Sequence, residues 1–429
     1  MTETTQASVG ERALAAFPGG IANGEYGLPH DLVLAMERAE GCRLWDTDGN
    51  EFLDMSMGWG SVLVGHARPE VVAAVTAQAP KGLNYAFLNP PALAVAEEIR
   101  RVAPAAERLR FCASGTEATM YCQRLARGFR GKEKILKFEG AYHGANETGV
   151  TSLFPSKNLN FPEPELTSAG TPAAVRQLLV APYNDIAAAR SIISEYADEL
   201  AAVIVEPLQR CTAPMPGFLE GLREACTESG VLLIFDEVVT GFRLAYGGAQ
   251  EFYGVIPDLV AYGKALGGGA PIGAFGGKAE IMEMVAEDRL GGEDYVWQAS
   301  TLGGNPFSCA AAEAALSVYR QPGTYEHLFG LGDYLRDGMR RVLADTGTTA
   351  QIIGAGPLAQ VVFSPDPVFD YRSTKKGDGA RGRALMLALF RNRVFLNPMG
   401  TKLYLSLAHD EAAVDELLER FGAALGDAG

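Results

Sequence analysis

Five short apolar runs alternate with longer helical stretches between residues 70 and 300, and this alternation restricts the fold more than any other feature. The runs are rich in Val, Ile, Leu and Phe and are found at Leu109–Ala113, Lys134–Phe138, Ala202–Val205, Val231–Phe235 and Leu259–Tyr262. Strands that are covered on both faces have this composition. The helical stretches, which can serve as crossovers, lie at about 116–129, 185–197, 217–229 and 278–287. The sequence therefore predicts an α/β fold with a mainly parallel central sheet flanked by helices.

The length of the chain indicates a second, smaller domain. A single core rarely grows beyond about 300 residues, and this chain has 429. After Pro306 an Ala-rich helix, another helix to about 345, two or three short strands and a final helix from about 410 predict a small α+β domain. We expect an N-terminal segment (1–65) that contributes to the small domain, a large domain (66–305) and the C-terminal small domain (306–429). Residues 43–54 are predicted to form a hairpin.

The composition disfavours several kinds of partner. The net charge of −15 argues against nucleic acid and anionic membranes, and no apolar run approaches the ~20 residues that span a bilayer. The six cysteines form no CxxC pair, so neither a metal site nor a disulfide framework is indicated. The start of the chain lacks the basic and apolar regions of a secretory signal. A cytoplasmic location is expected.

A lysine and an aspartate follow two of the predicted strands. Lys264 comes soon after Leu259–Tyr262 and precedes three glycines, which would let a flat ligand approach the backbone. Asp236 ends another apolar run, at the strand edge where α/β folds bind ligands. Their separation of 28 residues allows one helical crossover, so adjacent strands can carry them. A surface lysine and a turn-binding aspartate are the plainer interpretations. A Schiff-base lysine and the partner of a pyridine nitrogen are the functional ones.

Two loops offer sites for an anion. Ser114, Gly115 and Thr116 place hydroxyls and backbone N–H groups at the start of a helix, where anions bind. An ordinary N-cap complemented by Glu117 explains the same residues. Thr301 lies in a hydroxyl-rich loop before the next helix and can supply a second phosphate contact.

The remaining strand exits carry further candidates. Tyr142 and His143 follow one strand, and the tyrosine can stack on a planar ring, although a half-buried structural tyrosine fits equally well. Glu206 ends another strand and belongs to the same edge. Trp59 lies in a loop of small residues and is a plausible wall of the site. The agreement of an amine, a pyridinium partner and two phosphate-holding loops predicts an active site that binds pyridoxal phosphate.

In combination these motifs resemble the class III pyridoxal-phosphate aminotransferases of fold type I, and the pattern is closest to the glutamate-1-semialdehyde aminomutases. The resemblance covers nearly the whole chain. It rests on Phe17–Gly20, Leu44–Asn50, Gly65-His66, Ser114–Ala118, Lys137–Gly144, Asp236–Arg243 and Ala245–Gly276.

The family implies how the site holds its cofactor, pyridoxal 5′-phosphate. Asp236 pairs with the pyridine nitrogen, while Tyr142 and Val238 cover the two faces of the ring. His143 and Glu206 also belong to the implied cofactor site.

The family also implies a role for the lysine and for a second subunit. Lys264 forms the aldimine and later shuttles a proton between Cα and C4′. Ser114, Gly115 and Thr116 hold the phosphate. Thr301 matches the threonine that reaches the phosphate of the neighbouring subunit, which implies a homodimer with shared active sites.

The chain departs from the aminomutases where the substrate is expected to bind. In those enzymes Phe-Pro-Gly-Gly precedes an Asn-Ser-Pro-Val-Arg segment whose arginine meets the substrate carboxylate, whereas residues 21–27 here contain no arginine. Arg210 occupies a position where relatives often have glycine, and Cys211 replaces a site-lining asparagine or glutamate. We hypothesise that Arg210 or Lys402 anchors an acid, or that the amine-bearing end of the substrate is not an α-carboxylate. Two solvated surface cations are the alternative.

These residues favour an aminotransferase that passes an amino group from an amino donor to a keto or aldehyde acceptor through aldimine and pyridoxamine phosphate intermediates. An isomerase, either an aminomutase or an epimerase, is the first alternative. The missing arginine disfavours the aminomutase, and no residue identifies itself as the second proton donor of an epimerase. A cofactor-binding regulator would need an appended DNA-binding module or a lost lysine. A dehydrogenase would need a GxGxxG turn, which follows none of the strands.

Overall fold

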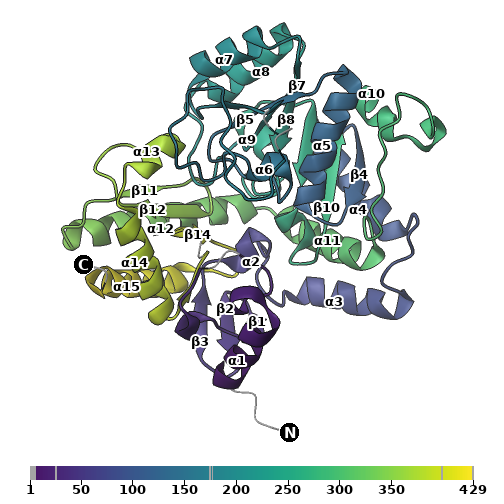
Figure 1. Ribbon diagram of the computed structural model, residues 1–429. Coiled ribbons are helices and arrows are strands. Elements are labelled where there is room, and N and C mark those ends of the chain that lie inside the picture. The colour runs from purple at the N-terminus through teal and green to yellow at the C-terminus, as the bar shows by residue number, and fades with distance from the viewer. Residues whose placement is uncertain (1–5, 25–26, 173–174, 176, 398–399, 428–429) are drawn as a thin grey trace. The chain divides into compact units, whose positions relative to one another are not determined.

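The computed structural model describes residues 6–24, 27–172, 175, 177–397 and 400–427 (Figure 1). The described residues fall into two compact units. Unit 1 takes residues from 1–69, 322–368 and 372–429, and unit 2 takes residues from 70–321 and 369–371.

The core of unit 2 is a sheet that has seven strands among the described residues, in the order β4, β10, β9, β8, β7, β5 and β6. Their bounds are β4 Arg108–Cys112, β5 Lys134–Phe138, β6 Leu179–Ala181, β7 Leu200–Val205, β8 Leu232–Asp236, β9 Leu259–Tyr262 and β10 Gly273–Gly277. β10 is antiparallel to both of its neighbours, and the other pairs are parallel. The C-terminal ends of all strands except β10 therefore share one edge. The predicted mainly parallel sheet is confirmed.

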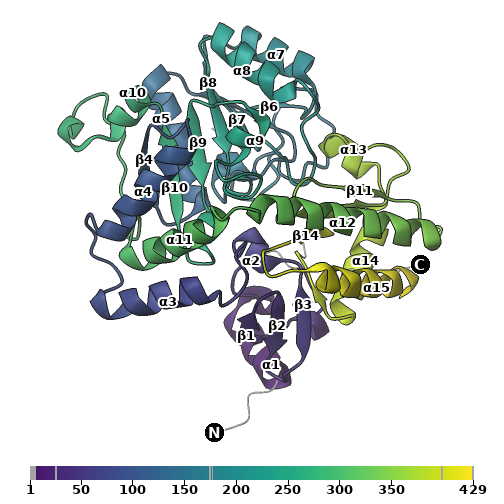
Figure 2. The same cartoon turned by 180° about the vertical axis from the view of Figure 1, so that it is seen from behind.

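Helices cover this sheet. Those of unit 2 are α3 Pro69–Gln78, α4 Pro90–Val102, α5 Gly115–Arg130, α6 Glu147–Val150, α7 Ile186–Glu195, α8 Phe218–Glu228, α9 Ala249–Tyr253, α10 Ala279–Met282 and α11 Pro306–Tyr319. Helix α5 packs across β7, β8, β9 and β10 (Figure 1). Figure 2 shows α7 and α8 side by side at one margin of the sheet. The α5 face buries a cluster of small and branched residues that includes Ala118, Cys122 and Leu125.

The predicted helix at 278–287 is wrong in one respect, because the chain forms three short pieces there. These are α10, η6 Glu283–Val285 and η7 Glu287–Arg289. Ala286 is extended (φ −70°, ψ 139°) and separates the last two. In a longer helix the carbonyls of Met284 and Val285 would accept hydrogen bonds from residues of the next turn. Here they accept from remote residues, because the Val296 N–H donates to Met284 O and Arg110 Nη2 donates to Val285 O.

Strand β10 was not predicted, because its sequence Gly-Ala-Phe-Gly-Gly has low strand propensity. The glycines allow close approach of a neighbouring backbone. A Cβ atom on Gly273 would lie 2.3 Å from Ser114 O. Gly273 is required because Ser114, which is distant in the sequence, packs against it, and no local sequence pattern shows this contact.

Unit 1 contains two small sheets. One runs in the order β1 Met36–Glu40, β2 Arg43–Asp46, β3 Glu51–Asp54 and β13 Val394–Phe395, and the other consists of β11 Gln351–Ile353, β12 Leu358–Val362 and β14 Lys402–Tyr404. The predicted hairpin is β2–β3. Its turn is held by Asp46, which accepts hydrogen bonds from the N–H groups of Asp48 and Asn50.

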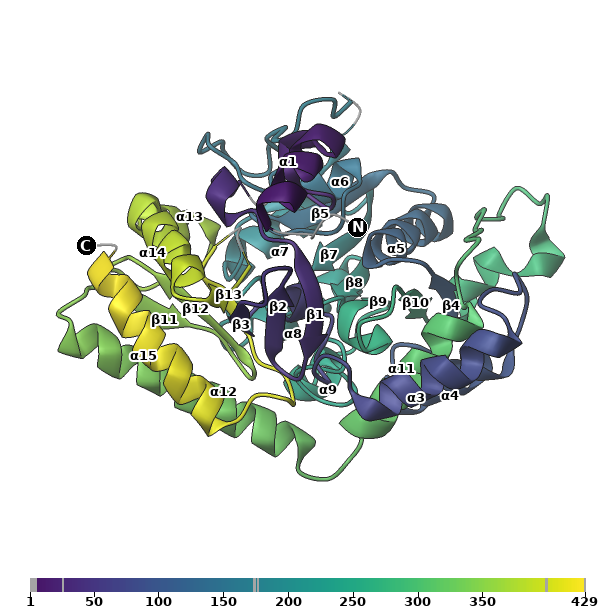
Figure 3. The ribbon, with the colours of Figure 1, turned by 90° about the horizontal axis from the view of Figure 1, so that it is seen from below.

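The helices of unit 1 complete its core. They are α1 Gln6–Ala16, α2 Met57–Gly60, α12 Thr324–Asp345, α13 Tyr371–Lys375, α14 Gly379–Arg391 and α15 Glu411–Asp427, although Tyr371 itself belongs to unit 2. Figure 3 shows α12 beside α15, and α14 also packs on α15. Leu335, Leu389 and Leu417 from these three helices lie in one buried cluster.

The compact units differ from the predicted domain bounds mainly after Pro306, and also at Pro69 and at 369–371. Helix α11 packs against α4 and against the short helix η5 Lys264–Gly267, so unit 2 extends to Gln321 rather than ending before Pro306. Whether the units are independently folding domains stays a prediction. Within the described ranges, no helix is long and apolar enough to cross a membrane.

Candidate active site

The strands of unit 2 bring most of the predicted site residues to one edge of the sheet. Lys264 begins η5 directly after β9, and Asp236 is the last residue of β8. These two strands are paired, with Asp236 opposite Ala261. The 28-residue spacing therefore does place Lys264 and Asp236 on adjacent strands. Lys264 has a left-handed backbone (φ 44°), an uncommon conformation for a residue other than glycine and one that is enriched at functional sites.

Asp236 is buried and receives two hydrogen bonds. Its Oδ2 lies 2.8 Å from Nδ1 of His143, and its Oδ1 accepts from the Val238 N–H at 3.1 Å. Because an ionised carboxylate only accepts, the proton of this pair sits on Nδ1. His143 is fully buried, and its Nε2 has no hydrogen-bond partner among the described residues. The hydrogen bonds to His143 and to the Val238 N–H fix the orientation of this carboxylate.

The start of α5 combines a capped turn with two backbone N–H groups that no described residue accepts from. Ser114 caps the helix by accepting from the Glu117 N–H, and Glu117 returns the contact by accepting from the Ala113 N–H at 2.6 Å. The plainer N-cap interpretation is thus correct for Ser114 and Glu117. The N–H groups of Gly115 and Thr116, however, have no acceptor in the part of the chain that the structure describes. Unsatisfied N–H groups at a helix start attract phosphate.

Small residues keep the space beside this helix narrow. A Cβ atom on Gly115 would lie 2.7 Å from Cγ1 of Val238, and one on Gly263 would lie 3.3 Å from the same atom. Val238 therefore packs between the phosphate-binding turn and the residue before Lys264. Gly144 is similarly close to Thr116, where a Cβ atom would come within 2.7 Å of the backbone.

Glu206 holds the segment that carries the predicted ring-stacking residue. Its Oε1 accepts from the Tyr142 N–H at 2.8 Å, and its Oε2 accepts from the Arg210 N–H at 3.3 Å. The Tyr142 side chain is 38% exposed, so its ring is available to a ligand. Glu206 thus acts on the backbone of this segment, which the sequence did not indicate.

Lys137 fixes the same segment from within the core. Its buried ammonium donates to the carbonyls of Ala141, Thr148, Gly149 and Thr151 at 2.7–3.1 Å. Burial lowers the pKa of Lys137 to about 7, whereas the four carbonyls favour its charged form. In the sequence Lys137 is visible as a lysine inside an apolar strand, but no structural role was predicted for it.

Glu237, the acid next to Asp236 in the sequence, is engaged by the protein's own backbone and side chains. Its carboxylate accepts from the N–H groups of Ala249 and Gln250 and from the hydroxyl of Thr240. Burial raises its pKa to about 7. Glu237 therefore serves the fold, and Asp236 is the acid that faces the strand edge.

Three further predicted residues lie in other segments of the chain. Thr301 is exposed, and its carbonyl accepts from Asn84 Nδ2 at 3.0 Å. Trp59 and Lys402 belong to unit 1, where Trp59 has a left-handed backbone (φ 57°). Lys402 is buried, with its ammonium 4.8 Å from the centre of the Tyr404 ring. The alternative of a solvated surface cation is therefore wrong for Lys402.

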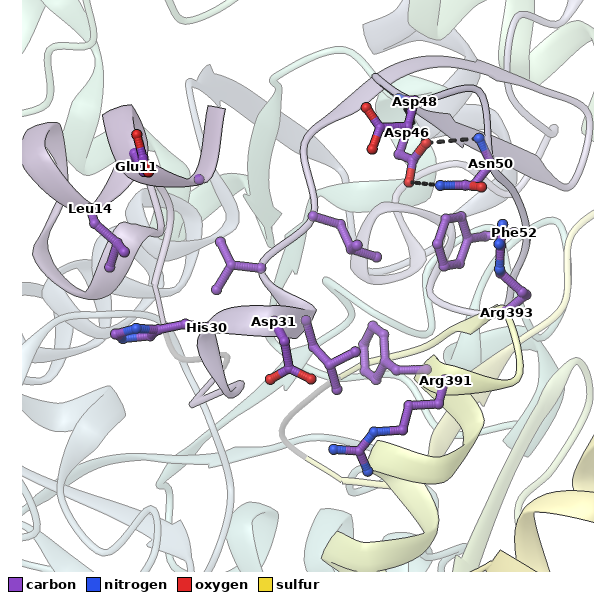
Figure 4. Close-up of a pocket in the computed structure, with 15 residues that line it drawn as sticks. Glu11, Leu14, His30, Asp31, Asp46, Asp48, Asn50, Phe52, Arg391 and Arg393 are labelled. Carbon is purple, nitrogen blue, oxygen red and sulfur yellow. Dashed lines mark hydrogen bonds between the residues drawn. The ribbon is translucent and has the colours of Figure 1, made fainter. Parts of the chain in front are cut away.

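Unit 1 also contains a hollow of about 550 Å³ beside the β2–β3 turn (Figure 4). Its polar lining includes Asp31, Asp46, Arg391 and Arg393. The Asp46 carboxylate accepts hydrogen bonds from Asn50 in the hairpin turn, which the dashed lines mark. None of the predicted site residues lines this hollow, and we assign no ligand to it.

Comparison with known proteins identifies the family. The family model described as aminotransferase class-III matches residues 27–425. The chain belongs to the class III aminotransferases. A glutamate-1-semialdehyde 2,1-aminomutase of Desulfitobacterium hafniense (strain Y51) is 40% identical over 388 residues, which cover 89% of this chain and 88% of the relative.

Two solved structures are similar over the whole chain. An omega-transaminase from Sphaerobacter thermophilus is 33% identical with a TM-score of 0.91, and the match covers 100% of this chain and 98% of that one. A transaminase with pyridoxal phosphate bound is 28% identical with a TM-score of 0.88 and the same coverage. This chain is therefore a class III enzyme that uses pyridoxal phosphate, with small molecules as its substrates, and its fold is that of these aminotransferases.

The residues of the site fit this cofactor. The unsatisfied N–H groups of Gly115 and Thr116 suit the phosphate, and the His143-bound carboxylate of Asp236 suits a protonated ring nitrogen. Val238 packs closely against Gly115 and Gly263, so it lies beside both the start of α5 and the residue before Lys264. Lys264, which supplies the amine, follows β9, the strand paired with the one that ends at Asp236.

Proposed function

We propose that this class III enzyme is an aminotransferase that moves an amino group from an amino donor to a keto or aldehyde acceptor. The observation that carries the proposal is the segment at 21–27, which lacks the arginine that binds the substrate carboxylate in the aminomutases. Residues 25–26 of that segment lie outside the described residues. The whole-chain similarity to an omega-transaminase supports the same assignment.

Each residue at the sheet edge has a role in this proposal. Pyridoxal phosphate supplies an electrophilic carbonyl carbon and a ring that accepts an electron pair. Lys264 would hold the cofactor through its amine, and once the donor's amine has displaced it, the freed Lys264 amine would take the proton from the carbon that bears the donor's amino group. Asp236, oriented by His143, keeps the ring nitrogen protonated. Proximity makes this proton transfer fast, because Lys264 is held on a strand end.

The other residues hold the cofactor in place. Ser114, Gly115 and Thr116 bind the phosphate through the start of α5, and Val238 covers one face of the ring. Tyr142 covers the opposite face, with its backbone tied to Glu206.

An intramolecular aminomutase is the second candidate. It is favoured by the 40% identity to an enzyme of that name, which exceeds the identity to the omega-transaminase. Both reactions use the same lysine and aspartate, so the site by itself serves either. An epimerase would need a second proton donor on the face opposite Lys264, and we propose no residue for that role.

We further propose that the enzyme is a homodimer with shared active sites. The loop before α4 exposes four large apolar side chains, Leu83, Tyr85, Phe87 and Leu88, and Phe87 is 84% exposed. Exposed apolar surface of this kind usually meets a partner. The loop is joined to the Thr301 segment by Asn84, which binds Thr301 O, and by Asn89, which binds Gly304 O. A second copy that covers the loop would bring Thr301 toward the phosphate of its neighbour.

The test is a visible absorption spectrum of the purified enzyme during addition of single amino compounds. An aminotransferase loses the colour of the bound cofactor when one donor is added without an acceptor, and an equivalent amount of keto or aldehyde product appears. An isomerase consumes its substrate while the colour returns and no carbonyl product is released. The second result would reject the aminotransferase.

The Lys264→Ala variant is the control for the lysine assignment. Its band should shift to that of free cofactor, and the half-reaction should slow by about 10⁴-fold, the upper range for loss of a general acid–base group. A variant that still reacts at the wild-type rate would remove Lys264 from the site.

A further inference from the structure

We propose that Arg210 is a positioning residue that clamps the segment carrying Tyr142, rather than a ligand of an acidic substrate. The inference rests on the proposed function, since it assigns Tyr142 to one face of the cofactor ring.

The contacts of Arg210 all lead to that segment. Its Nε and Nη2 both donate to Gly140 O, at 3.3 and 3.2 Å. Its own N–H donates to Glu206, whose second oxygen accepts from the Tyr142 N–H. Arg210 therefore reaches the chain two residues before Tyr142 through its side chain, and Tyr142 itself through Glu206.

The guanidinium is also packed between its neighbours. It lies 5.3 Å from the centre of the Phe154 ring. The Gly140 N–H donates to Ser152 O at 2.8 Å, so the loop that carries Phe154 is bonded to Gly140, whose carbonyl accepts from Arg210. Gly140 is in turn covered by Tyr371, because a Cβ atom at Gly140 would lie 2.4 Å from the Tyr371 ring. The arginine thus closes a small cluster around Gly140.

The backbone of Arg210 supports a role for its side chain. Its φ of 61° is left-handed, a conformation that glycine adopts without strain and that costs energy in other residues. Glycine could make the Glu206 contact through its N–H equally well. What arginine adds at this strained position is the guanidinium fork on Gly140 and its contact with Phe154.

This geometry argues against the substrate anchor. An anchoring arginine offers its fork to a carboxylate in a bidentate pair. Here Nε and Nη2 are both engaged with one backbone carbonyl. An acid that bound the Nε–Nη2 edge would have to displace that bond and release the Tyr142 segment.

The experiment compares two substitutions in the full chain with a matched control. Arg210→Gly removes the guanidinium and the strain but keeps the N–H. Arg210→Lys keeps the charge but has no fork. Arg393→Gly is the control, because Arg393 is also left-handed (φ 60°) and lies 5.4 Å from the centre of the Phe52 ring, but belongs to unit 1.

The first readout is amide hydrogen exchange of residues 140–143, with and without added pyridoxal phosphate. We expect both Arg210 variants to exchange about ten-fold faster, as loss of one charged hydrogen bond predicts, while Arg393→Gly exchanges at the wild-type rate. Cofactor affinity should fall by about the same factor in both Arg210 variants. Exchange equal to that of Arg393→Gly would overturn the proposal.

The second readout is the KM for acidic and for neutral amino donors. We expect Arg210→Gly to change both values by the same factor. A KM that rises about ten-fold or more for acidic donors alone would identify a substrate anchor instead. The exchange measurement needs no turnover. A wild-type enzyme that fails to transaminate would therefore reject the proposed function without deciding the role of Arg210.

Discussion

Nδ1 of His143 lies 2.8 Å from Oδ2 of Asp236, and both side chains are buried at the carboxyl edge of the unit 2 sheet. The pair joins residues that are 93 positions apart in the sequence. The histidine limits the directions in which Asp236 can accept a further hydrogen bond. The acid is thereby preorganised for a cationic ring nitrogen, since it need not reorient when the cofactor binds.

Replacing Asp236 by Asn should therefore lower the rate of the half-reaction without unfolding the protein. We expect a loss of about 100-fold or more, as for removal of other preorganised electrostatic groups, because a neutral amide no longer favours a protonated ring nitrogen. Single-turnover spectroscopy measures this rate.

Asp258 provides the matched control for that substitution. It is equally buried, but it lies just before β9, where it pairs with Arg223 and Lys278. Asp258→Asn should cost stability and leave the half-reaction rate within a few fold. Equal rate losses in the two variants would point to general damage rather than to the cofactor.

Adding a methyl group at Gly115 should weaken cofactor binding. The new Cβ atom would lie 2.7 Å from Val238 Cγ1 and push that side chain out of place. Overpacking of this kind costs about 1–3 kcal/mol, so the dissociation constant of pyridoxal phosphate should rise about ten-fold or more. Titration of the apoenzyme measures it. If the clash is the cause, Gly115→Ala combined with Val238→Ala should bind better than Gly115→Ala alone.

Loss of the Lys137 ammonium should destabilise unit 2. Lys137→Met leaves four carbonyl groups without their donor, three of them in buried contacts, which should cost about 3 kcal/mol or more. The midpoint of urea unfolding, followed by fluorescence, measures the change. Lys134 lies on the same strand and binds Glu199 near the surface, so Lys134→Met should have a small effect. Equal midpoints for the two variants would contradict the role of Lys137.

The buried His409 should make unit 1 sensitive to acid. Its Nδ1 accepts from the Ser406 N–H at 3.0 Å, so the proton of the neutral ring is on Nε2, which donates to Asp54 O. Burial lowers the pKa of His409 from 6.5 to about 4. Because the unfolded chain binds this proton more readily, stability falls as the pH drops from 6.5 toward 4, by about 3 kcal/mol.

The His409→Asn variant isolates this contribution. The Asn Oδ1 can accept from Ser406 without titrating. Urea unfolding between pH 7 and 4 should show a shallower loss of stability in the variant than in the wild type. Parallel pH profiles would show that His409 is not the group responsible.

The exposed apolar loop should control assembly and, through it, the cofactor. Phe87→Ser combined with Leu88→Ser should shift the protein from dimer to monomer, because these side chains are 84% and 73% exposed and would be covered by a second copy. Light scattering measures the mass. Loss of the neighbouring Thr301 should also weaken cofactor binding. A wild-type monomer with full cofactor affinity would contradict both expectations.

The sequence predicted the sheet and the ends of its strands well. The five apolar runs became β4, β5, β7, β8 and β9 with bounds within two residues. A strand that is buried on both faces forms a continuous apolar run in the sequence. A polar residue directly after such a run can be recognised without knowing the fold. The adjacency of Asp236 and Lys264 followed from the length of one crossover between their strands.

Contacts between distant residues had no such signature. The sequence by itself determined five strands of the sheet, their order along the chain and which polar groups follow them, because these depend on neighbouring residues. Only the tertiary structure decided that β10 enters the sheet, that 278–287 breaks into short helices, and that Lys137 and Arg210 hold the Tyr142 segment. The physical reason is that a carbonyl, a glycine surface or a buried amine acquires its partner only when remote parts of the chain pack together.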